Sequence, residues 1–341
     1  MGFKRLEADD FVVSAQAQTS TVWSGNSPTL TTFFTQSNQV QSVSGKYYTV
    51  VYNAESGSSR EAQFEIAYGN STGGGGLAFN SNVNNYSPTT TIYGSYRTLV
   101  LEDENASFIF GDTTGSSIYA LSIERARYKE SLFPGSLNLT LKKGSEVVVL
   151  SDNSKDVTVP TYYGSMRAYQ IVSGSNGSAF SGTGYSTSGS YGLFLPDIGT
   201  ILLNGDALDL GASNGGISLG TNKTVNTEGN NNQKLFNAIV DGVSSAPTTS
   251  SFGLNSEETI TSDFVFVRAR NSEFNYSENP SYISGSTGEV IYNYFINNPQ
   301  TYITTVGLYN DSNELLATAK LSKPLNKDFT KEALVRVKLD F

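Results

Sequence analysis

The sequence contains neither cysteine nor histidine among its 341 residues. Without a thiol or an imidazole, the chain cannot form a disulfide, a cysteine nucleophile or a Ser-His-Asp triad. The usual ligands of structural zinc and the axial pairs that hold haem are missing as well. Carboxylates, lysine, tyrosine, serine and threonine are the groups that remain for chemistry. We therefore expect a non-enzymatic protein that uses no cofactor and no metal ion.

Charge is also scarce, because charged residues make up only 16% of the chain. Acidic residues outnumber basic ones by 31 to 22, which gives a net charge of −9. This excess repels the phosphates of nucleic acids and anionic membrane surfaces, so we expect neither as a partner. Aromatic residues reach 12%, with 20 Tyr and 19 Phe. Disordered chains are poor in such residues, so this chain is expected to fold.

Long hydrophobic runs are absent, since the longest purely apolar stretches cover only residues 147–150 and 264–267. A membrane-spanning helix needs about 20 apolar residues. The first residues carry Lys4 and Arg5, but no apolar stretch of the kind found in secretory signals follows them. We therefore expect a protein that is made, or assembled, in a cytosol.

Alternation of apolar and polar residues dominates the sequence and indicates β-strands. In the stretch 62–68, for example, Phe64, Ile66 and Tyr68 share one face of the predicted strand. Strands are expected at residues 46–52, 62–68, 98–101, 107–110, 118–123, 136–141, 146–150, 258–269, 289–296, 301–309, 315–320 and 333–341.

The stretch 118–129 has two interpretations. Arg125, Arg127 and Lys129 continue the alternation, so we expect the strand to run on into an exposed, charged end. A helical alternative also collects Ile118, Leu121 and Ala126 on one side. The residues 310–313 (Asn-Asp-Ser-Asn) are typical of a hairpin turn between two strands.

One short helix is expected at residues 233–242, where Leu235, Phe236, Ile239 and Val240 recur with helical spacing. Gly242 is suited to end it. The predicted fold is therefore all-β, mainly antiparallel sandwiches, with one short helix and long loops rich in Gly, Ser and Asn. The expected domains are an N-terminal β domain (1–145), a loop-rich middle region (146–232) and a C-terminal β-sandwich domain that begins with the helix (233–341).

Two stretches, 173–192 and 211–232, are nearly low in complexity and are expected to be loops. The first is interpreted as a flexible loop or exposed arm in which Tyr185 and Tyr191 contact a partner. The four glycines at 73–76 also indicate a loop. They are not interpreted as a phosphate cradle, because no Gly-Lys-Ser or Gly-Lys-Thr follows them.

Paired carboxylates are the one catalytic device that the composition permits, as in glycoside hydrolysis. Clusters occur at residues 102–104, at Asp152 and Asp156, at Asp206 and Asp209, and at Glu257 and Glu258. Each lies in a turn-like setting, where acidic side chains are common for reasons of backbone hydrogen bonding. The oxygen-bearing residues 152–156 resemble calcium ligands in type only, because the spacing of a helix-loop-helix calcium site is not met.

The C-terminal third is rich in aromatic side chains that we expect to lie in the core or at an interface with other subunits. These residues are Tyr282, Tyr292, Tyr294, Phe295 and Tyr302.

Four phrases of the sequence resemble segments in virion structural proteins of contractile-tailed bacteriophages, especially those of marine cyanobacteria. They are SEETITSDFVFVRARNSEFNYSENPSY (256–282), TYITTVGLYNDSNELLATAKLSKPL (301–325), FTKEALVRVKLDF (329–341) and IYALSIERARYKESLFPGSLNLTL (118–141). The resemblance implies a non-enzymatic tail subunit, of the baseplate wedge or the tail periphery. It brings no active-site residues with it.

This resemblance also implies partners and a location. The partners would be other tail and baseplate proteins in a homo- or hetero-oligomer, and the location would be the virion tail, assembled in the host cytoplasm. Two alternatives stay open: a receptor-binding or glycan-depolymerising tail protein, and a capsid decoration protein.

Overall fold

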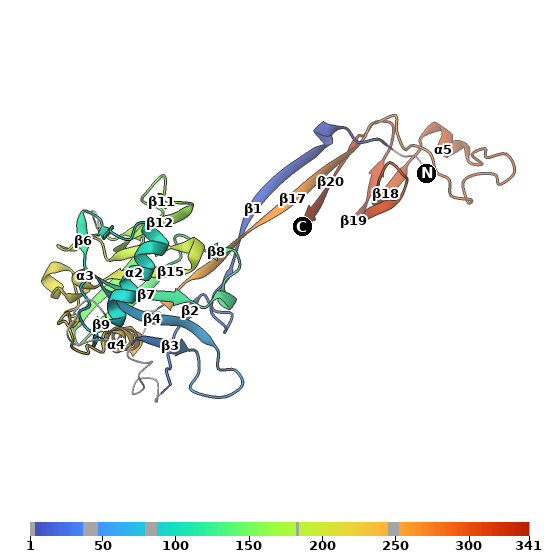
Figure 1. Cartoon of the computed structure of the whole chain (residues 1–341). Helices are drawn as coiled ribbons and strands as arrows, with labels where there is room; N and C mark the ends of the chain where they lie inside the picture. Colours follow the sequence, from blue (N-terminus) through green and yellow to red (C-terminus); the bar gives the residue numbers. More distant parts are fainter. Residues whose placement is uncertain (1–3, 37–46, 79–86, 182–183, 245–251, 341) are drawn as a thin grey trace. The chain divides into compact units, whose positions relative to one another are not determined.

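A computed structural model describes residues 4–36, 47–78, 87–181, 184–244 and 252–340. The chain forms two compact units (Figure 1). We call Gln18–Glu258 the central unit, and Met1–Ala17 together with Thr259–Phe341 the terminal unit. The boundaries expected from the sequence, at 145/146 and 232/233, fall elsewhere. The first lies in the turn of a hairpin formed by β9 (Asn138–Lys143) and β10 (Glu146–Asp152).

The central unit is built on one large antiparallel sheet. Its strand order is β2 (Thr29–Leu30), β16 (Phe252–Gly253), β9, β10, β12 (Met166–Ser175), β14 (Gly192–Leu195), β15 (Thr200–Asn204), β7 (Ser117–Ile123), β4 (Ala62–Asn70) and β3 (Tyr48–Tyr52). Two short strands, β11 (Thr161–Tyr163) and β13 (Ser178–Ala179), also pair with β12. The all-β, antiparallel fold class expected from the sequence is confirmed.

The sheet curls around a cluster of apolar side chains. Phe64 on β4 and Phe252 on β16 are far apart in the strand order, yet their ring centroids are 5.2 Å apart. The Trp23 ring lies 4.9 Å from that of Phe252. All three side chains belong to the larger of two hydrophobic clusters, which we call the inner cluster.

Successive side chains of β7 point to opposite faces of this sheet and are buried on both. Tyr119 and Leu121 point into the inner cluster, while Ile118 and Ala120 belong to a second cluster, the outer cluster. The outer cluster is covered by α2 (Pro88–Leu101), whose Tyr93 is only 1% exposed. Because both faces are covered, almost every residue of β7 is buried.

α2 replaces a predicted strand, so the expectation of a strand at 98–101 is wrong. Pro88 occupies the first turn, where its fixed φ and missing N–H suit a helix start. Thr98 and Val100 favour strands locally, but packing on the outer cluster overrides that weak preference.

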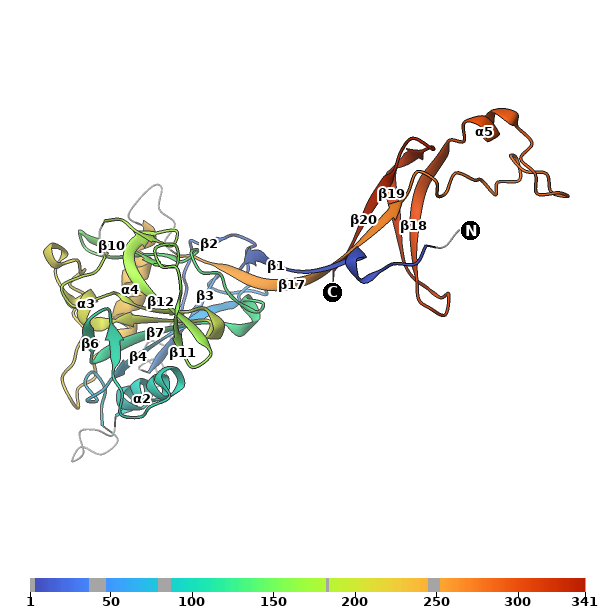
Figure 2. The same cartoon turned by 90° about the horizontal axis from the view of Figure 1, so that it is seen from above.

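The predicted helix is confirmed as α4 (Asn231–Ser244), which places Leu235, Phe236 and Ile239 in the inner cluster. Its face of the sheet is opposite to that covered by α2 (Figure 2). The prediction that the strand at 118 continues to Lys129 is wrong. β7 ends at Ile123, and a short 3₁₀ helix, η3 (Arg125–Arg127), follows it.

Short elements complete the central unit. They are β5 (Phe108–Phe110), β6 (Thr113–Gly115), β8 (Ser131–Leu132), η4 (Pro196–Ile198), α3 (Gly205–Asp209) and η5 (Ala212–Asn214).

The terminal unit contains strands with few buried side chains. β17 (Asn255–Ala269) lies between β1 (Phe11–Thr21) and β20 (Ala333–Asp340) in the strand order of a small sheet. β18 (Thr301–Tyr309) and β19 (Leu315–Lys327) form the predicted hairpin. Both β1 and β17 cross the division between the two units in the sequence. A 3₁₀ turn, η1 (Ala8–Asp10), precedes β1, and Phe341, the expected last residue of β20, lies outside the described residues.

The strand expected at 289–296 is wrong, because residues Asn293–Asn297 form the short helix α5. The helix forms because two side chains pack on the ring of Tyr282. Tyr292 and Phe295, three residues apart, both contact Tyr282, with centroid distances of 5.7 and 5.3 Å. A helical turn brings residues with this spacing to the same side, whereas a strand would separate them.

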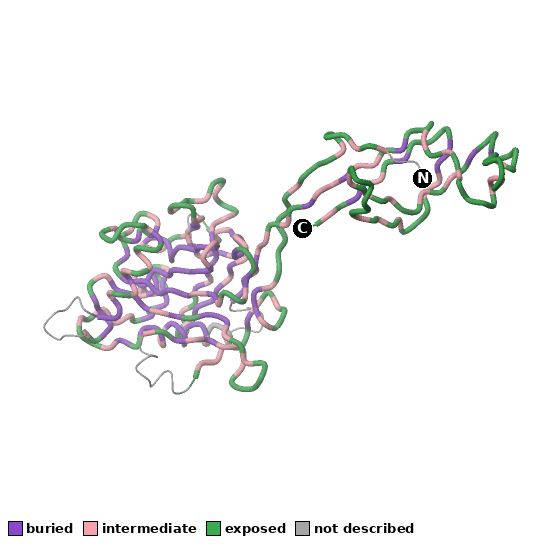
Figure 3. The backbone as a smooth tube through the Cα atoms, turned by 45° about the vertical axis from the view of Figure 1, so that its right-hand side comes forward, coloured by how far each residue is buried: buried purple, intermediate pink, exposed green. Residues whose placement is uncertain are grey.

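Burial differs sharply between the units, as Figure 3 shows. The inner and outer clusters both lie entirely within the central unit. Among the described residues of the terminal unit, the buried apolar side chains are Val265, Ala269, Phe295, Ala333 and Val337. In the described part of the chain, no helix is both long and apolar enough to cross a membrane.

Two glycines near α2 provide a matched test of this packing. A Cβ on Gly69 of β4 would lie 2.8 Å from the backbone nitrogen of Tyr93, so Gly69→Ala should push α2 off the sheet. We expect it to lower the free energy of unfolding by about 2 kcal/mol. A Cβ on Gly94, inside α2, would meet no atom within 4 Å, so Gly94→Ala should raise it by about 0.5–1 kcal/mol. Urea unfolding measures the free energy of unfolding of both variants. Equal effects of the two substitutions would contradict the close approach of α2 to β4.

Candidate functional site

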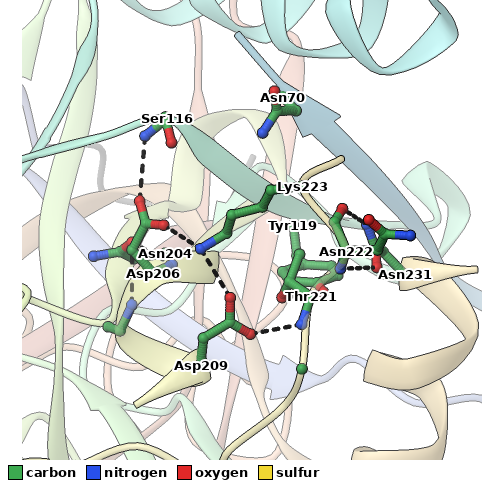
Figure 4. Close-up of polar contacts among 12 residues, drawn as sticks. Asn70, Ser116, Tyr119, Asn204, Asp206, Asp209, Thr221, Asn222, Lys223 and Asn231 are labelled. Carbon is green, nitrogen blue, oxygen red and sulfur yellow. Dashed lines mark hydrogen bonds and ion pairs between the residues drawn. The ribbon is translucent and has the colours of Figure 1, made fainter. Parts of the chain in front are cut away.

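A cluster of polar side chains lies beside the central sheet and joins two of the predicted carboxylates (Figure 4). Lys223 Nζ is 2.5 Å from Asp206 Oδ1 and 2.9 Å from Asp209 Oδ2. Both aspartates come from α3, where their spacing of three residues brings them to one side. Asn204 begins this helix, and its side chain accepts a hydrogen bond from the Asp206 amide.

Backbone donors satisfy the other two carboxylate oxygens. The amide of Ser116 donates to Asp206 Oδ2 at 3.3 Å, and that of Thr221 donates to Asp209 Oδ1 at 2.8 Å. Burial lowers the pKa of Lys223, but hydrogen bonds and charge from Asp206 and Asp209 outweigh it and leave the pKa raised. The lysine is therefore a fixed cation between two carboxylates, an arrangement suited to tying segments together.

The segment that carries Lys223 is held to the rest of the unit on several sides. The hydroxyl groups of Tyr119 and Thr221 lie 2.8 Å apart. The side chain of Asn231 accepts from the amide of Asn222 at 2.8 Å and donates to its carbonyl at 2.9 Å. The low-complexity stretch 211–232 is thus fixed by specific polar contacts.

The glycines at 73–76 allow close contact with this same segment. A Cβ on Gly74 would collide with the carbonyl oxygen of Lys223, and the Gly75 amide donates to the Thr224 carbonyl at 2.9 Å. The stretch forms the expected loop, and its backbone lies against the segment that carries Lys223. Glycine is required there because no larger residue fits.

Two of the other three predicted carboxylate clusters are likewise engaged within the chain, whereas residues 102–104 are exposed. Asp152 is fully buried, and its oxygens accept the amides of Gly135 at 2.9 and 3.0 Å and of Ser154 at 3.0 Å. Burial raises its pKa. Asp156 binds the amide of Ala179 at 2.7 Å instead of joining Asp152.

Glu257 and Glu258 face different cations. Glu257 lies 3.7 Å from Arg167, and Glu258 lies 3.1 Å from Lys129. Glu102 ends α2 in a left-handed conformation, with φ of 56°. In the described ranges, no three acidic side chains come together in a way that could hold a metal ion.

Four of the aromatic residues predicted from the sequence form one cluster in the terminal unit. Tyr282 contacts Tyr292 and Phe295, and Tyr292 contacts Tyr294 with centroids 5.3 Å apart. Phe295 is buried, whereas Tyr292 and Tyr294 are 43% and 62% exposed. Phe295 is thus the local core residue, and the two tyrosines present their rings to solvent.

An open groove of about 1000 Å³ adjoins this cluster. Aromatic rings and opposite charges line it together: Lys4, Arg5, Glu273, Glu278, Phe274, Tyr276, Tyr282, Phe295 and Tyr302. Tyr302, the fifth predicted aromatic residue, is 60% exposed on β18. The structure therefore brings the five predicted residues of this unit to one region.

Buried Lys327 holds the wall of the groove in place. Its Nζ donates to the carbonyl of Asn271 at 3.0 Å and to the side chain of Asn275 at 2.8 Å. The Thr301 hydroxyl also donates to the carbonyl of Phe274, at 2.8 Å. Neither Lys327 nor Lys223 stood out in the sequence, because a lone lysine in a polar stretch carries no pattern.

The two tyrosines predicted in an exposed arm lie in the central unit. Tyr191 is 2% exposed, belongs to the inner cluster and donates to the Gly215 carbonyl at 2.7 Å. The prediction of an interface role for Tyr191 is therefore corrected to a core role. Tyr185 is 38% exposed and packs against Gly111.

The stretch 173–192 is also not the flexible arm that its composition indicated, as far as it is described. β13 pairs with β12, and the amide of Ser173 donates to the Gly184 carbonyl at 2.9 Å. Residues 182 and 183 lie outside the described residues.

Large apolar side chains are uncovered over much of the terminal unit. Those classed as exposed are Phe11, Val12, Val13, Phe274, Tyr276, Ile291, Tyr292, Tyr294, Ile296, Tyr302, Tyr309, Leu315, Leu316, Phe329 and Leu334. Contiguous apolar patches larger than a few hundred Å² are rare on monomeric soluble proteins and commonly mark interaction sites.

Comparison of the chain with protein-family models, with curated proteins and with solved structures found no match.

Replacing Lys223 tests whether its cluster is a structural tie. Lys223→Met leaves Asp206 and Asp209 facing each other without a cation, and should lower the free energy of unfolding at pH 7 by about 2 kcal/mol, since the site is partly exposed. Lys142→Met is the control, because Lys142 is a half-buried lysine of β9. This substitution should lower the free energy of unfolding by less than about 0.5 kcal/mol.

The same variant has a defined pH dependence. The folded-state pKa of Lys223 is raised above 10.5, so its stabilisation is complete below that pH and is lost as the pH rises through the folded pKa. The difference in unfolding free energy between wild type and Lys223→Met should therefore shrink at alkaline pH. Urea unfolding from pH 7 upward measures it, and a difference that grows with pH would contradict the assignment.

Proposed function

We propose that this chain is a non-enzymatic structural subunit that assembles with other proteins through its terminal unit. The observation that carries this proposal is the uncovered apolar surface of that unit. Leu316 and Leu334 are 68% and 64% exposed, although burial of one such side chain contributes about 1.5–3 kcal/mol. A unit of this composition gains stability when a neighbouring subunit covers it.

The polar groups support the same proposal. Asp152, Asp206 and Asp209, three of the candidates for acid-base work, are each engaged by backbone amides or by Lys223. A general acid or base has to reach its substrate with at least one free oxygen. Structural ties of this kind suit a protein whose role is to hold its shape.

The resemblance to virion proteins supports a place in a contractile tail, in the baseplate wedge or at the tail periphery. Three of the four similar phrases, at 256–282, 301–325 and 329–341, fall almost entirely in the terminal unit. In this proposal the partners are other tail and baseplate proteins, and the chain resides in the virion after assembly in the host cytoplasm.

One observation favours a second candidate function, binding of a cell-surface glycan. The groove beside Tyr282 combines exposed rings with neutralising charges, and its volume of about 1000 Å³ lies at the upper end of small-ligand sites. Aromatic faces with nearby hydrogen-bonding groups are able to bind sugar rings. A tail protein with this groove would contact the host surface.

Two equally exposed apolar residues allow a matched test of assembly. Leu316 in the terminal unit is 68% exposed and Val159 in the central unit is 70% exposed, so neither substitution by Asp should unfold the chain. In a phage that lacks its own copy of the gene, Leu316→Asp supplied in trans should lower infectious titre about 100-fold, because burying a carboxylate at an interface costs about 3 kcal/mol. Val159→Asp should restore the wild-type titre.

Three results would contradict the proposal: equal titres for the two variants, absence of the chain from purified virions by mass spectrometry, or release of reducing sugar from host polysaccharide by the purified chain. For the second candidate, Tyr302→Ala would leave the particle yield normal and reduce adsorption to host cells.

A further inference from the structure

A pocket of about 410 Å³ opens on the central sheet, on the face that points away from the inner cluster. Thr140 of β9 and Val149 of β10 line it and lie opposite each other in the strand register. Their neighbours Leu139 and Leu150 belong to the inner cluster, so the two lining side chains point to the other face. The outer cluster draws its strand residues from β5, β7, β12, β14 and β15 and leaves this end of the sheet open.

Hydrogen bonds within the chain hold the walls of the pocket. The side-chain oxygen of Asn138 accepts the amide of Asn176 at 2.9 Å and the hydroxyl of Ser175 at 3.1 Å, which fixes the turn between β12 and β13. The buried carboxylate of Asp152 fixes a second wall by accepting the amide of Gly135. These contacts are independent of any ligand, so the pocket is preformed, as most small-molecule sites are.

Two polar side chains in the pocket differ from those in its walls, because they form no hydrogen bond in the described part of the chain. Thr140 is only 3% exposed, and its hydroxyl has no partner there. Asn255 is half-buried, and its Oδ1 is enclosed without a partner. Buried polar atoms in folded proteins are nearly always hydrogen-bonded. The two groups therefore indicate a partner from outside the chain.

The lining restricts the chemistry of that partner. None of the described residues that line the pocket is charged, so an ion would lose its hydration without gaining an opposite charge. A purely apolar molecule would leave Thr140 and Asn255 unpaired. A hydroxyl group both donates and accepts, so it is able to serve the Asn255 oxygen as well as the Thr140 hydroxyl. Val149 and Leu254 add aliphatic contacts that suit C–H groups.

We propose that this pocket binds one ring of a neutral saccharide, with Thr140 and Asn255 hydrogen-bonded to its hydroxyl groups. A neutral sugar ring carries several hydroxyl groups on a C–H frame, which matches the lining. The volume of about 410 Å³ falls within the range of small-ligand sites. All lining residues belong to the central unit, so the site is separate from the groove beside Tyr282 and does not depend on assembly through the terminal unit.

Saturation-transfer NMR with free hexoses tests the class of ligand. The full chain is mixed with glucose, galactose or mannose at about 10 mM, which detects dissociation constants in the millimolar range. At least one of the three hexoses should bind. The uronate of the same ring should bind at least about tenfold more weakly, because its carboxylate meets no cation in the lining. The inference is overturned if no hexose binds, or if a hexose and its uronate bind equally.

Two substitutions test the position of the site. Thr140→Val keeps the shape of the side chain and removes its unpartnered hydroxyl, so the free energy of unfolding should not fall. Hexose affinity should fall about 3–10-fold in this variant and in Asn255→Leu. Thr114→Val, an exposed position of β6 outside the pocket, is the matched control and should bind hexose like the wild type.

Two outcomes of this comparison would overturn the site. One is unchanged affinity in both Thr140→Val and Asn255→Leu. The other is loss of binding in Tyr302→Ala alone, which would place the hexose in the groove beside Tyr282.

These measurements also separate the inference from the proposed function. Absence of hexose binding combined with a defective Leu316→Asp phage would reject only the saccharide pocket. Hexose binding that Thr140→Val weakens, combined with full titre for Leu316→Asp, would retain the pocket and reject assembly through the surface at Leu316.

Discussion

The uneven burial of apolar side chains is the constraint on which the rest of the structure depends. In the central unit, one curled sheet has apolar side chains on both faces, and α2 and α4 cover them. The contact between Phe64 and Phe252 closes this arrangement across the core. The terminal unit has no comparable cluster among its described residues. Its strands are formed, but few of their apolar side chains are buried among the described residues.

Polar contacts hold chain segments in place in both units. The Lys223 cluster fixes a glycine- and asparagine-rich segment that also buries Ile217 and Leu219 in the inner cluster. Lys327 does the same for the wall of the aromatic groove. In each case one ammonium group joins segments that carry few apolar residues. This arrangement lets long polar stretches adopt one conformation in a protein without disulfides or histidine.

The sequence predicted those elements whose pattern is local. Alternation identified β4 and β7, and helical spacing identified α4. α2 was missed because Thr98 and Val100 favour strands, and only packing on the outer cluster decides otherwise. The stretch 173–192 includes β13, which pairs with β12. Amino-acid composition alone does not reveal such backbone pairing. The aromatic residues near Tyr282 were predicted as a group, but their arrangement around one ring required the fold.

Hydrogen exchange along the chain tests most directly the proposal that contacts with other molecules stabilise the terminal unit. In dilute solution, amides of the hairpin β18–β19 should exchange at least about a hundredfold faster than those of β7 and β15, since local stability follows apolar burial. At high concentration or within an assembly, the hairpin amides should become protected while β7 and β15 stay unchanged. Equal protection of both units in dilute solution would contradict the account.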